Sequence, residues 1–548
     1  MAQVGTTPEG VPIILLKEGT SQSRGRDAQR NNIRAAKLIA EIIQTSLGPR
    51  GMDKMLVDSL GDITITNDGA TILKEIDVQH PAAKMMVEVA KATDSEVGDG
   101  TTSSVVLAGA LLEKAESLID DEIHPVIIAE GYKKASKKAI EFLTEITISI
   151  EPKDKEILEK VANTSMQTKL VSIEATDLAR LAVSAVLAII EEKNGAFKVN
   201  LDNIKIEKKT GGSISDSELV SGIILDKEIV HSGMPRRIEN AKIALINEAL
   251  EIKKTEFEAK LNISSPNQIK SFMEEENQML KDMASKIKST GANVVLCQKG
   301  IDDIIQHYLS KEGILAVRRI KESDMTKLAK ATGGRIVGRV DDLNDTELGL
   351  AENVEEKRVE EDNWVFIEGC KNPKAISILL RGGTQRVIDE ADRSMHDALM
   401  VVKDVIEKPK IVYGGGSPEA FIALKLRDWS KSLSGRDQLA VEKFADAMES
   451  IPLALSRNAG MNPIDTITQL RSRQSKGEKF TGVDVTNGTI ADFQKLGIIE
   501  PVKVKEQIIK SATETANMIL RIDNVVASSR SSAPPQGGMG GMPGMGME

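Results

Sequence analysis

The six residues from Gly98 to Ser103, GDGTTS, constrain this chain most strongly, because they combine a flexible backbone, one carboxylate and three hydroxyls. A helical pattern ends at Val97 and an apolar run opens after Ser103, which places the segment between two helices. Unpaired amides at the start of the second helix favour an anion, and Asp99 offers Mg²⁺ a hard oxygen ligand. A capped turn between two helices explains the same residues, so the segment alone leaves a phosphate site and a structural turn both open.

Size and charge narrow the class of protein. A chain of 548 residues has room for roughly three to four domains of about 150 residues each. Aromatic residues make up 3% of the chain and the formal net charge is −10, so base stacking and attraction to phosphate backbones are both poorly supported. The composition therefore argues against a nucleic-acid-binding protein.

The cysteines and the apolar runs bear on the cellular compartment. Cys297 and Cys370 are too few for a disulfide framework and fit a reducing cytoplasm as buried free thiols. The most apolar run, residues 178–190, contains Arg180 and is too short to span a bilayer. We therefore expect a cytoplasmic protein that is neither secreted nor membrane-spanning.

The N-terminal third has a helical texture interrupted by one strand. Apolar residues recur at three- and four-residue spacing after Arg26, which predicts an amphipathic helix with Gly48 as its C-terminal stop. The alternating residues 62–66 predict a strand, and the NDG sequence at 67–69 that follows is typical of a hairpin turn. Considered alone, Asp68 is therefore a turn residue.

The middle of the chain changes character, because strand-like runs alternate with helices from about residue 216 and indicate an α/β architecture. Within it, residues 251–290 are densely charged and helical, with a break at 262–266. Apolar side chains lie near that break, among them Phe257, Leu261, Ile263, Phe272 and Met273. They indicate a partner surface on a protruding arm, although two antiparallel helices packed on each other explain them equally well.

The C-terminal part returns to the texture of the N-terminal third. A strand-like run at 376–380 leads into a helix that carries His396 and Asp397, and a second Gly-rich loop at 412–418 precedes another helix. The similar texture of the two ends suggests one domain made from both. From Ser528 onward Ser, Pro, Gly and Met dominate, which predicts a mobile tail without a packed core.

Six short motifs occur together and in order: LGPRGMDKM (47–55), TNDGATI (66–72), GDGTT (98–102), SMHDAL (394–399), YGGGSPE (413–419) and LGIIEP (496–501). Each motif alone is a weak signal. In combination they resemble the group II chaperonins, and within that family the archaeal thermosome subunits. The resemblance runs from about Gly19 to Val526.

The resemblance implies a multidomain α and α/β fold. A mostly helical equatorial ATPase domain would be formed from both chain ends, a small α/β intermediate domain from two hinge-like segments, and an α/β apical domain would carry a helical protrusion. The implied segments are 1–150 and 407–527 (equatorial), 151–215 and 369–406 (intermediate), 216–368 (apical, protrusion at about 251–285), and 528–548 (disordered Gly- and Met-rich tail).

The resemblance also implies ATP and Mg²⁺ as cofactors. Asp99 corresponds to the Mg²⁺ ligand, Glu500 to the carboxylate that receives the ribose hydroxyls, and Lys505 to a nearby basic contact. The remaining implied nucleotide contacts are Leu47, Gly48, Pro49, Asn67, Gly69, Gly100, Thr101, Thr102, Ser103, Gly415 and Gly416.

Three further residues are implied in ATP hydrolysis. Asp397 corresponds to the carboxylate that positions the attacking water, Asp68 to one that assists it, and Lys169 to a lysine that senses the γ-phosphate. Because Asp397 and Asp99 would belong to different domains, hydrolysis would be coupled to domain closure. The lysine loop reads MQTKL (166–170), which departs from the Gly-Lys-Gly of many archaeal relatives.

The implied assembly is a double ring, homo- or hetero-oligomeric, with eight or nine subunits per ring, which encloses non-native client proteins under a built-in lid. Two other functions remain open: an ATP-binding scaffold or holdase without active folding, and a stand-alone ATPase or kinase acting on a small molecule. No sequence feature indicates an acceptor pocket for the kinase. The apolar-tipped arm and the split ATPase residues favour the folding chamber.

Overall fold

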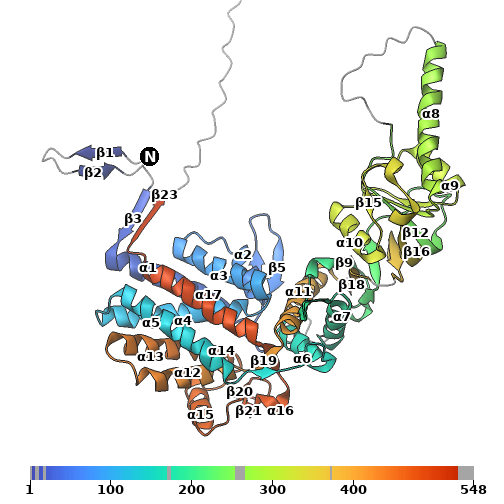
Figure 1. The fold of residues 1–548 in the computed structure, drawn as a ribbon. Helices are drawn as coiled ribbons and strands as arrows, with labels where there is room; N and C mark the ends of the chain where they lie inside the picture. The colour runs from blue at the N-terminus through green and yellow to red at the C-terminus, as the bar shows by residue number, and fades with distance from the viewer. Residues whose placement is uncertain are drawn as a thin grey trace, which may run out of the picture.

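The computed structural model describes residues 3–6, 12–15, 20–169, 175–252, 266–370 and 373–528. Figure 1 shows an elongated arrangement of a helix-rich body that holds both ends of the chain, a middle body, and a body with a large sheet from which α8 projects. The expectations for Phe257, Leu261 and Ile263, and for residues 529–548 of the tail, concern residues outside these ranges.

The helix-rich body is built from segments that lie far apart in the sequence. Helix α17, near the C-terminus, packs against the N-terminal helices α3, α4 and α5 (Figure 1). One hydrophobic core runs from Ile33 to Leu520 and extends into the middle body described below. Its helices are α1 (Gly25–Gln44), α2 (Gly69–Glu75), α3 (Pro81–Val97), α4 (Thr101–Asp120), α5 (Pro125–Thr144), α12 (Ser417–Ser430), α13 (Arg436–Met448), α14 (Ser450–Asn458), α15 (Pro463–Ser475), α16 (Phe493–Leu496) and α17 (Val502–Leu520).

Helix α4 lies at the centre of this body. Residues 103–112 are buried in succession, so apolar side chains face neighbours on all sides and not on a single stripe. Gly109 packs directly against the Ala40 side chain of α1, where an added Cβ would collide with it. The absence of side-chain bulk therefore lets α1 and α4 approach closely.

Short strands complete the helix-rich body. Strand β3, near the N-terminus, pairs antiparallel with β23, near the C-terminus, so that Arg24 lies opposite Asn524. The strands of this body are paired as β3 (Thr20–Arg24) with β23 (Asn524–Ser528), β4 (Lys54–Val57) with β5 (Ile63–Thr66), β20 (Thr481–Asp484) with β21 (Thr489–Asp492), and β19 (Lys410–Tyr413) with both β22 (Ile499–Pro501) and β6 (Ile148–Ser149). Strands β1 (Gln3–Thr6) and β2 (Pro12–Leu15) pair with each other and lie apart from the helices (Figure 1).

The middle body also draws on two distant segments. Strand β9 pairs parallel with β18, with Ile204 opposite Ile376, and helices α6, α7 and α11 pack on one another beside them. Its elements are α6 (Lys155–Met166), α7 (Ala175–Ala188), β7 (Glu191–Lys193), β8 (Ala196–Lys198), η1 (Leu201–Asn203), β9 (Ile204–Thr210), η2 (Ile214–Asp216), β10 (Glu218–Val220), β18 (Ile376–Gly382) and α11 (Gln385–Glu407).

The sheet body has its own core, separate from the large one. Strands β12, β13 and β14 are parallel, and the runs 243–246, 294–297 and 315–317 are fully buried, as expected for a sheet covered on both faces. Its elements are β11 (Gly222–Leu225), β12 (Arg237–Ile246), α8 (Pro266–Ser289), β13 (Val294–Cys297), α9 (Asp303–Lys311), β14 (Leu315–Val317), α10 (Glu322–Thr332), β15 (Ile336–Val337), η3 (Val340–Asp342), η4 (Asp345–Glu347), β16 (Gly349–Val359) and β17 (Asp362–Glu368).

Two local predictions are wrong. Helix α1 ends at Gln44, because the next turn tightens through hydrogen bonds from Ser46 N to Ile43 O and from Leu47 N to Gln44 O, so Gly48 is not its stop. The NDG sequence at 67–69 is not a hairpin turn, since residues 58–62 connect β4 to β5 and 67–69 lead into α2.

Asp68 has a different structural role from the one predicted. It is the N-cap of α2, and its Oδ2 accepts a hydrogen bond from the Thr71 amide at 2.8 Å. Asp and Asn serve helix caps and hairpin turns through the same short-range hydrogen bonds, so the local sequence does not separate the two roles. No helix among the described residues is long and apolar enough to cross a membrane.

Candidate functional site

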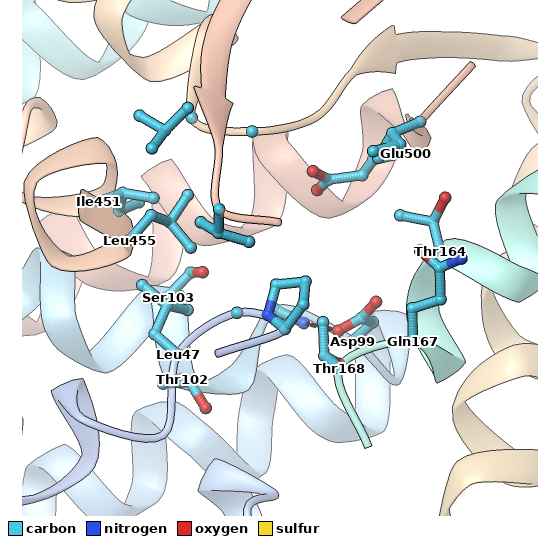
Figure 2. A pocket seen from close by; sticks show the side chains of 18 of the residues that line it. Leu47, Asp99, Thr102, Ser103, Thr164, Gln167, Thr168, Ile451, Leu455 and Glu500 are labelled. Atoms are coloured by element: carbon cyan, nitrogen blue, oxygen red, sulfur yellow. Dashed lines mark hydrogen bonds between the residues drawn. The ribbon is translucent and has the colours of Figure 1, made fainter. Parts of the chain in front are cut away.

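A cavity of about 340 Å³ lies in the helix-rich body, where the N-terminus of α4, the loop after α1 and the Gly-rich loop before α12 converge. All but two of the residues predicted for the site line it. They are Leu47, Gly48, Pro49, Asn67, Asp68, Asp99, Gly100, Thr101, Thr102, Ser103, Lys169, Gly415, Gly416, Glu500 and Lys505. Figure 2 shows Ile451 and Leu455 on one side of the cavity and Glu500 across from them.

The two remaining predicted residues lie just behind the cavity wall. A Cβ on Gly69 would be 2.5 Å from Thr102 Oγ1, so Gly69 lets α2 approach the start of α4. Asp397 is buried behind Lys169 and accepts a hydrogen bond from Lys169 Nζ. The structure therefore brings all the predicted residues to one place.

The GDGTTS segment joins α3 to α4 as predicted. Gly98 and Gly100 have φ values of 69° and 80°, so the chain reverses through two left-handed positions between the helices. Helix α4 begins at Thr101, and its first turn, residues 101–103, lines the cavity. Since the first amides of a helix have no acceptor within it, this wall presents N–H groups and hydroxyls suited to an anion.

Asp99 and Asn67 lie beside this helix end. Asp99 Oδ1 accepts a hydrogen bond from the Gly100 amide at 2.6 Å, which holds the carboxylate at the cavity wall. Asn67 Nδ2 donates to Thr168 O at 2.6 Å, whereas its buried Oδ1 has no hydrogen-bond partner among the described residues. Asn67 thus ties the loop after β5 to the loop after α6 and keeps one polar atom available.

A buried charge cluster joins the helix-rich body to the middle body. Lys169 Nζ contacts Asp397 of α11 and lies 3.6 Å from Asp68 Oδ1. Burial alone would lower the pKa of Lys169, but the two carboxylates raise it above its ordinary value. Burial raises the pKa of Asp397, and the negative charges of Asp68 and Asp99 act in the same direction against Lys169. One ammonium group therefore faces more negative charge than it neutralises.

A second charge network lies at the other end of the cavity. Lys505 Nζ lies 2.6 Å from Glu500 Oε2 and 2.9 Å from Glu419 Oε1. Burial and the nearby charge of Glu419 raise the pKa of Glu500, while Lys505 opposes that rise. Glu419 belongs to the YGGGSPE motif but was not predicted as a site residue. Its contact with Lys505 gives it a role in fixing Glu500.

Sequence reasoning missed most of the apolar wall. The apolar side chains of this wall come from α14, β20, α16, α17 and the loops after β20 and before β22, and they carry no polar group that would mark them in the sequence. Polar lining residues such as Gln167 and Asp484 were not predicted either. The cavity-lining residues outside the predicted set are Ser46, Thr164, Gln167, Thr168, Ile451, Leu455, Val483, Asp484, Val485, Thr486, Phe493, Ile498, Val504 and Ile508.

The side chains around the cavity suit a metal ion that binds together with a phosphate group. Across the described ranges, no group of three or more His, Cys, Asp or Glu side chains is arranged to hold a metal. Mg²⁺ on a phosphate group needs only one or two protein carboxylates, and Asp99 lies at the helix N-terminus where a phosphate would bind. The residues present therefore fit Mg²⁺ bound together with a phosphate.

Comparison with known proteins gives consistent results over nearly the whole chain. The model of the TCP-1/cpn60 chaperonin family matches residues 39–530. The chain is 55% identical to thermosome subunit beta of Archaeoglobus fulgidus over 540 residues, which cover 98% of this chain and 99% of that protein. It is 56% identical to the thermosome subunit of Pyrococcus horikoshii over 532 residues (97% of each), and 53% identical to thermosome subunit alpha of A. fulgidus over 537 residues (98% of each).

Proposed function

Because the chain belongs to the TCP-1/cpn60 chaperonin family, as its six motifs predicted, we propose that it is a thermosome subunit, an ATPase of a double-ring complex that folds non-native proteins. The observation that carries this proposal is the meeting of two separate segments at Lys169. Asp68 and Asp99 come from the helix-rich body and Asp397 from α11, and all three carboxylates act on that one ammonium.

The cavity is proposed to bind ATP with its phosphates at α4 and its base at the apolar wall. Thr101, Thr102 and Ser103 supply amides and hydroxyls to the phosphate oxygens. Glu500 accepts the ribose hydroxyls and is held in place by Lys505. The base then lies against the apolar side chains contributed by α14, β20 and α16, which recognise its flat faces without charge.

Asp99 is the residue proposed to hold Mg²⁺. When bound, the ion neutralises charge on the phosphate oxygens during transfer of the phosphoryl group. Asp99 is fixed for this purpose by its hydrogen bond from the Gly100 amide. The backbone of the same segment supplies the phosphate contacts, so one short loop positions both the nucleotide and its metal.

Hydrolysis is assigned to Asp397 and Asp68. Both carboxylates can accept hydrogen bonds from a water and direct it at the terminal phosphate, which is the main contribution a protein makes to phosphoryl transfer. Lys169 contacts both carboxylates and can also donate to a phosphate oxygen, because it lines the cavity. Since Asp397 lies on the middle body, the site is complete only when that body is docked on the helix-rich body.

The three bodies are assigned to the expected domains. We assign residues 1–150 and 407–527 to the equatorial domain, 151–215 and 369–406 to the intermediate domain, and 216–368 to the apical domain. Strand β10 falls within the last range, although it pairs with β18 of the middle body. The support is that one core combines both chain ends and continues into the middle body, whereas the large sheet has a core of its own. Helix α8 projects from the sheet body (Figure 1), and we assign it to the lid protrusion.

The assembly is proposed to be a double ring of eight or nine subunits per ring in the cytoplasm, with non-native proteins as clients. One organism, A. fulgidus, has relatives named thermosome subunit alpha and thermosome subunit beta. This chain is similar to both, so a ring of one subunit type and a ring of two types are both compatible with it.

The test is recovery of a chemically denatured enzyme by the purified assembly, with and without ATP. Asp397→Ala should retain ATP binding, lower turnover by roughly 10² to 10³-fold and abolish ATP-dependent recovery, because it removes water positioning but no phosphate contact. Asp392→Ala is the matched control, since Asp392 lies on the same helix and pairs with the exposed Lys208. Unchanged turnover in Asp397→Ala would contradict the assignment.

A second candidate function predicts a different result. A holdase or ATP-binding scaffold would suppress aggregation of the denatured enzyme equally well with or without ATP, and its Asp397→Ala variant would behave like the wild type. The buried contact between Lys169 and Asp397 favours active folding, because it makes the catalytic residues depend on domain docking.

A further inference from the structure

Gly98 lies where the helix-rich body meets α11. It caps the C-terminus of α3 with φ 69° and ψ −20°. A Cβ added to Gly98 would lie 2.5 Å from Cβ and 2.7 Å from Cγ of Met400, and 3.7 Å from Cα of Asp397. The backbone of Gly98 is therefore in direct contact with the part of α11 that carries Asp397.

From this contact we infer that Gly98 is a positioning residue for ATP hydrolysis, which sets how closely α11 approaches the helix-rich body and hence where Asp397 lies. The inference rests on the proposed role of Asp397 in hydrolysis. Asp397 and Met400 are three residues apart on a helix and so share one face. A displacement of α11 at Met400 must therefore carry Asp397 away from Lys169 and Asp68.

The contact with Met400 is separate from the backbone requirement at Gly98. A left-handed φ favours glycine at any helix C-cap, whatever surrounds it. Gly333 is such a cap, on α10, with φ 74° and ψ 5°, and a Cβ added there would meet nothing within 4 Å. Gly333 thus shares the backbone requirement of Gly98 without the contact, and it provides a matched control.

The size of the effect follows from the distances. Ordinary van der Waals contacts of a Cβ begin at 3.4 Å, so a side chain at Gly98 must push Met400 away by about 1 Å. A misplacement of about 1 Å in a catalytic group can lower turnover by roughly 10²-fold. The residues proposed to bind nucleotide, Thr101 and Glu500, lie on the helix-rich body and stay in place. Turnover should therefore fall while nucleotide affinity is retained.

The experiment compares Gly98→Ala and Gly98→Asn with Gly333→Ala in the assembled protein. Asn tolerates the left-handed backbone better than other residues but still adds a Cβ, so it isolates the contact from the backbone strain. We expect both Gly98 variants to lose roughly 10 to 10²-fold in kcat, with KM and the Kd for ADP within about twofold of wild type. Gly333→Ala should keep the wild-type kcat.

A compensating change tests the contact itself. In the Gly98→Ala background, Met400→Gly removes both close atoms and should restore part of the lost kcat. Met400→Ala keeps its Cβ at 2.5 Å and should restore none of it. Assembly size and melting temperature are measured first for each variant. If Gly98→Ala fails to assemble, the kcat of Gly98→Asn decides the question.

Two outcomes would overturn the inference. One is wild-type kcat in an assembled Gly98→Asn variant, and the other is an equal loss in Gly98→Ala and Gly333→Ala. A wild-type protein without ATPase activity would instead contradict the proposed function. The two failures are therefore distinguishable in the same set of measurements.

Discussion

Asp404 is a buried carboxylate that links the middle body to the helix-rich body. Its Oδ1 accepts a hydrogen bond from Lys503 Nζ of α17 at 2.7 Å, and its Oδ2 has no partner in the described part of the chain. Burial raises the pKa of Asp404 from 3.8 to about 6, against the effect of Lys503. The folded state therefore holds a proton on Asp404 at pH values where the unfolded state has released it.

The sign of the resulting pH dependence follows from this raised pKa. The free energy of unfolding should fall by about 3 kcal/mol as pH rises from about 3 to about 7, because the folded state must then accommodate a buried charge. Asp404→Asn removes that charge. We expect its melting temperature to exceed that of wild type at pH 7.5 and the difference to vanish near pH 3, below the unfolded pKa of an aspartate.

A control separates Asp404 from the other carboxylates that titrate in this range. Asp428 pairs with Lys431 at the surface, so Asp428→Asn should change the melting temperature little at either pH. Parallel pH profiles for wild type and Asp404→Asn would contradict the prediction.

Among individual residues, the sequence identified those whose side chains carry distinctive chemical groups. Asp99 and the hydroxyls of 101–103 were predicted from their own groups, and they lie together as expected. Glu419 was not predicted, because its role depends on Lys505, which is far away in the sequence. The apolar wall was also missed, since residues such as Leu455 resemble any core residue until the fold brings them to a cavity.

At the level of elements, the junction between β9 and α10 is fixed by a buried lysine. Lys205 Nζ donates to Asp324 Oδ2 at 3.0 Å and to Ile224 O at 2.8 Å, and it lies 2.7 Å from Glu207 Oε1. Lys205 and Asp324 are both buried. This cluster joins the middle body to the sheet body, so it should hold their relative position.

Removing the lysine should be costly. Lys205→Met leaves Asp324 buried without its cation, which typically costs about 3 to 5 kcal/mol. We expect a lower melting temperature and faster cleavage by limited proteolysis near the junction, and Asp324→Leu should recover part of the loss in the double variant. Lys208→Met is the control on the same strand, because Lys208 is more exposed and should contribute less than about 1 kcal/mol. Equal losses in the two lysine variants would show that the buried cluster has no special role.

Helices and strands were predictable where their side chains are buried on one face or on all faces. The strand-like run at 376–380 became β18, and the helical pattern that stops before Gly98 became the end of α3. Strand β4 was missed, because half of its residues are exposed and its sequence is short. The NDG error arose because a helix cap and a hairpin turn use the same residue types.

For the whole molecule, the projecting helix α8 should separate hydrolysis from encapsulation. Phe272 and Met273 are exposed on it, so apolar groups are available at its surface for contacts with other subunits or clients. Deletion of residues 255–275 removes the first ten residues of α8 and touches no residue of the cavity. We expect the ATPase rate to change less than about twofold and protection of a bound client from protease to be lost. Continued protection would contradict the lid assignment.

The spacing of apolar residues in the sequence could not predict how the three bodies are arranged. The similar texture of the two chain ends suggested that they belong together, but nothing in either end specifies that α17 fills a space between α3, α4 and α5. Only the resemblance to a known family implied that arrangement. Contacts between distant segments depend on shape and not on a local pattern, so a single sequence does not encode them in readable form.

The packing of helix α17 against the N-terminal helices has a consequence for the synthesis of the protein on the ribosome. Helix α17 completes a core that α1, α3, α4 and α5 begin, so the first helices leave the ribosome long before their final partner exists. At about 5 to 20 residues per second, the interval between α5 and α17 is roughly 20 to 75 s. During that time apolar surfaces of the early helices stay open to other contacts. A subunit proposed to fold non-native proteins therefore exposes apolar surface of its own until its last helix is synthesised.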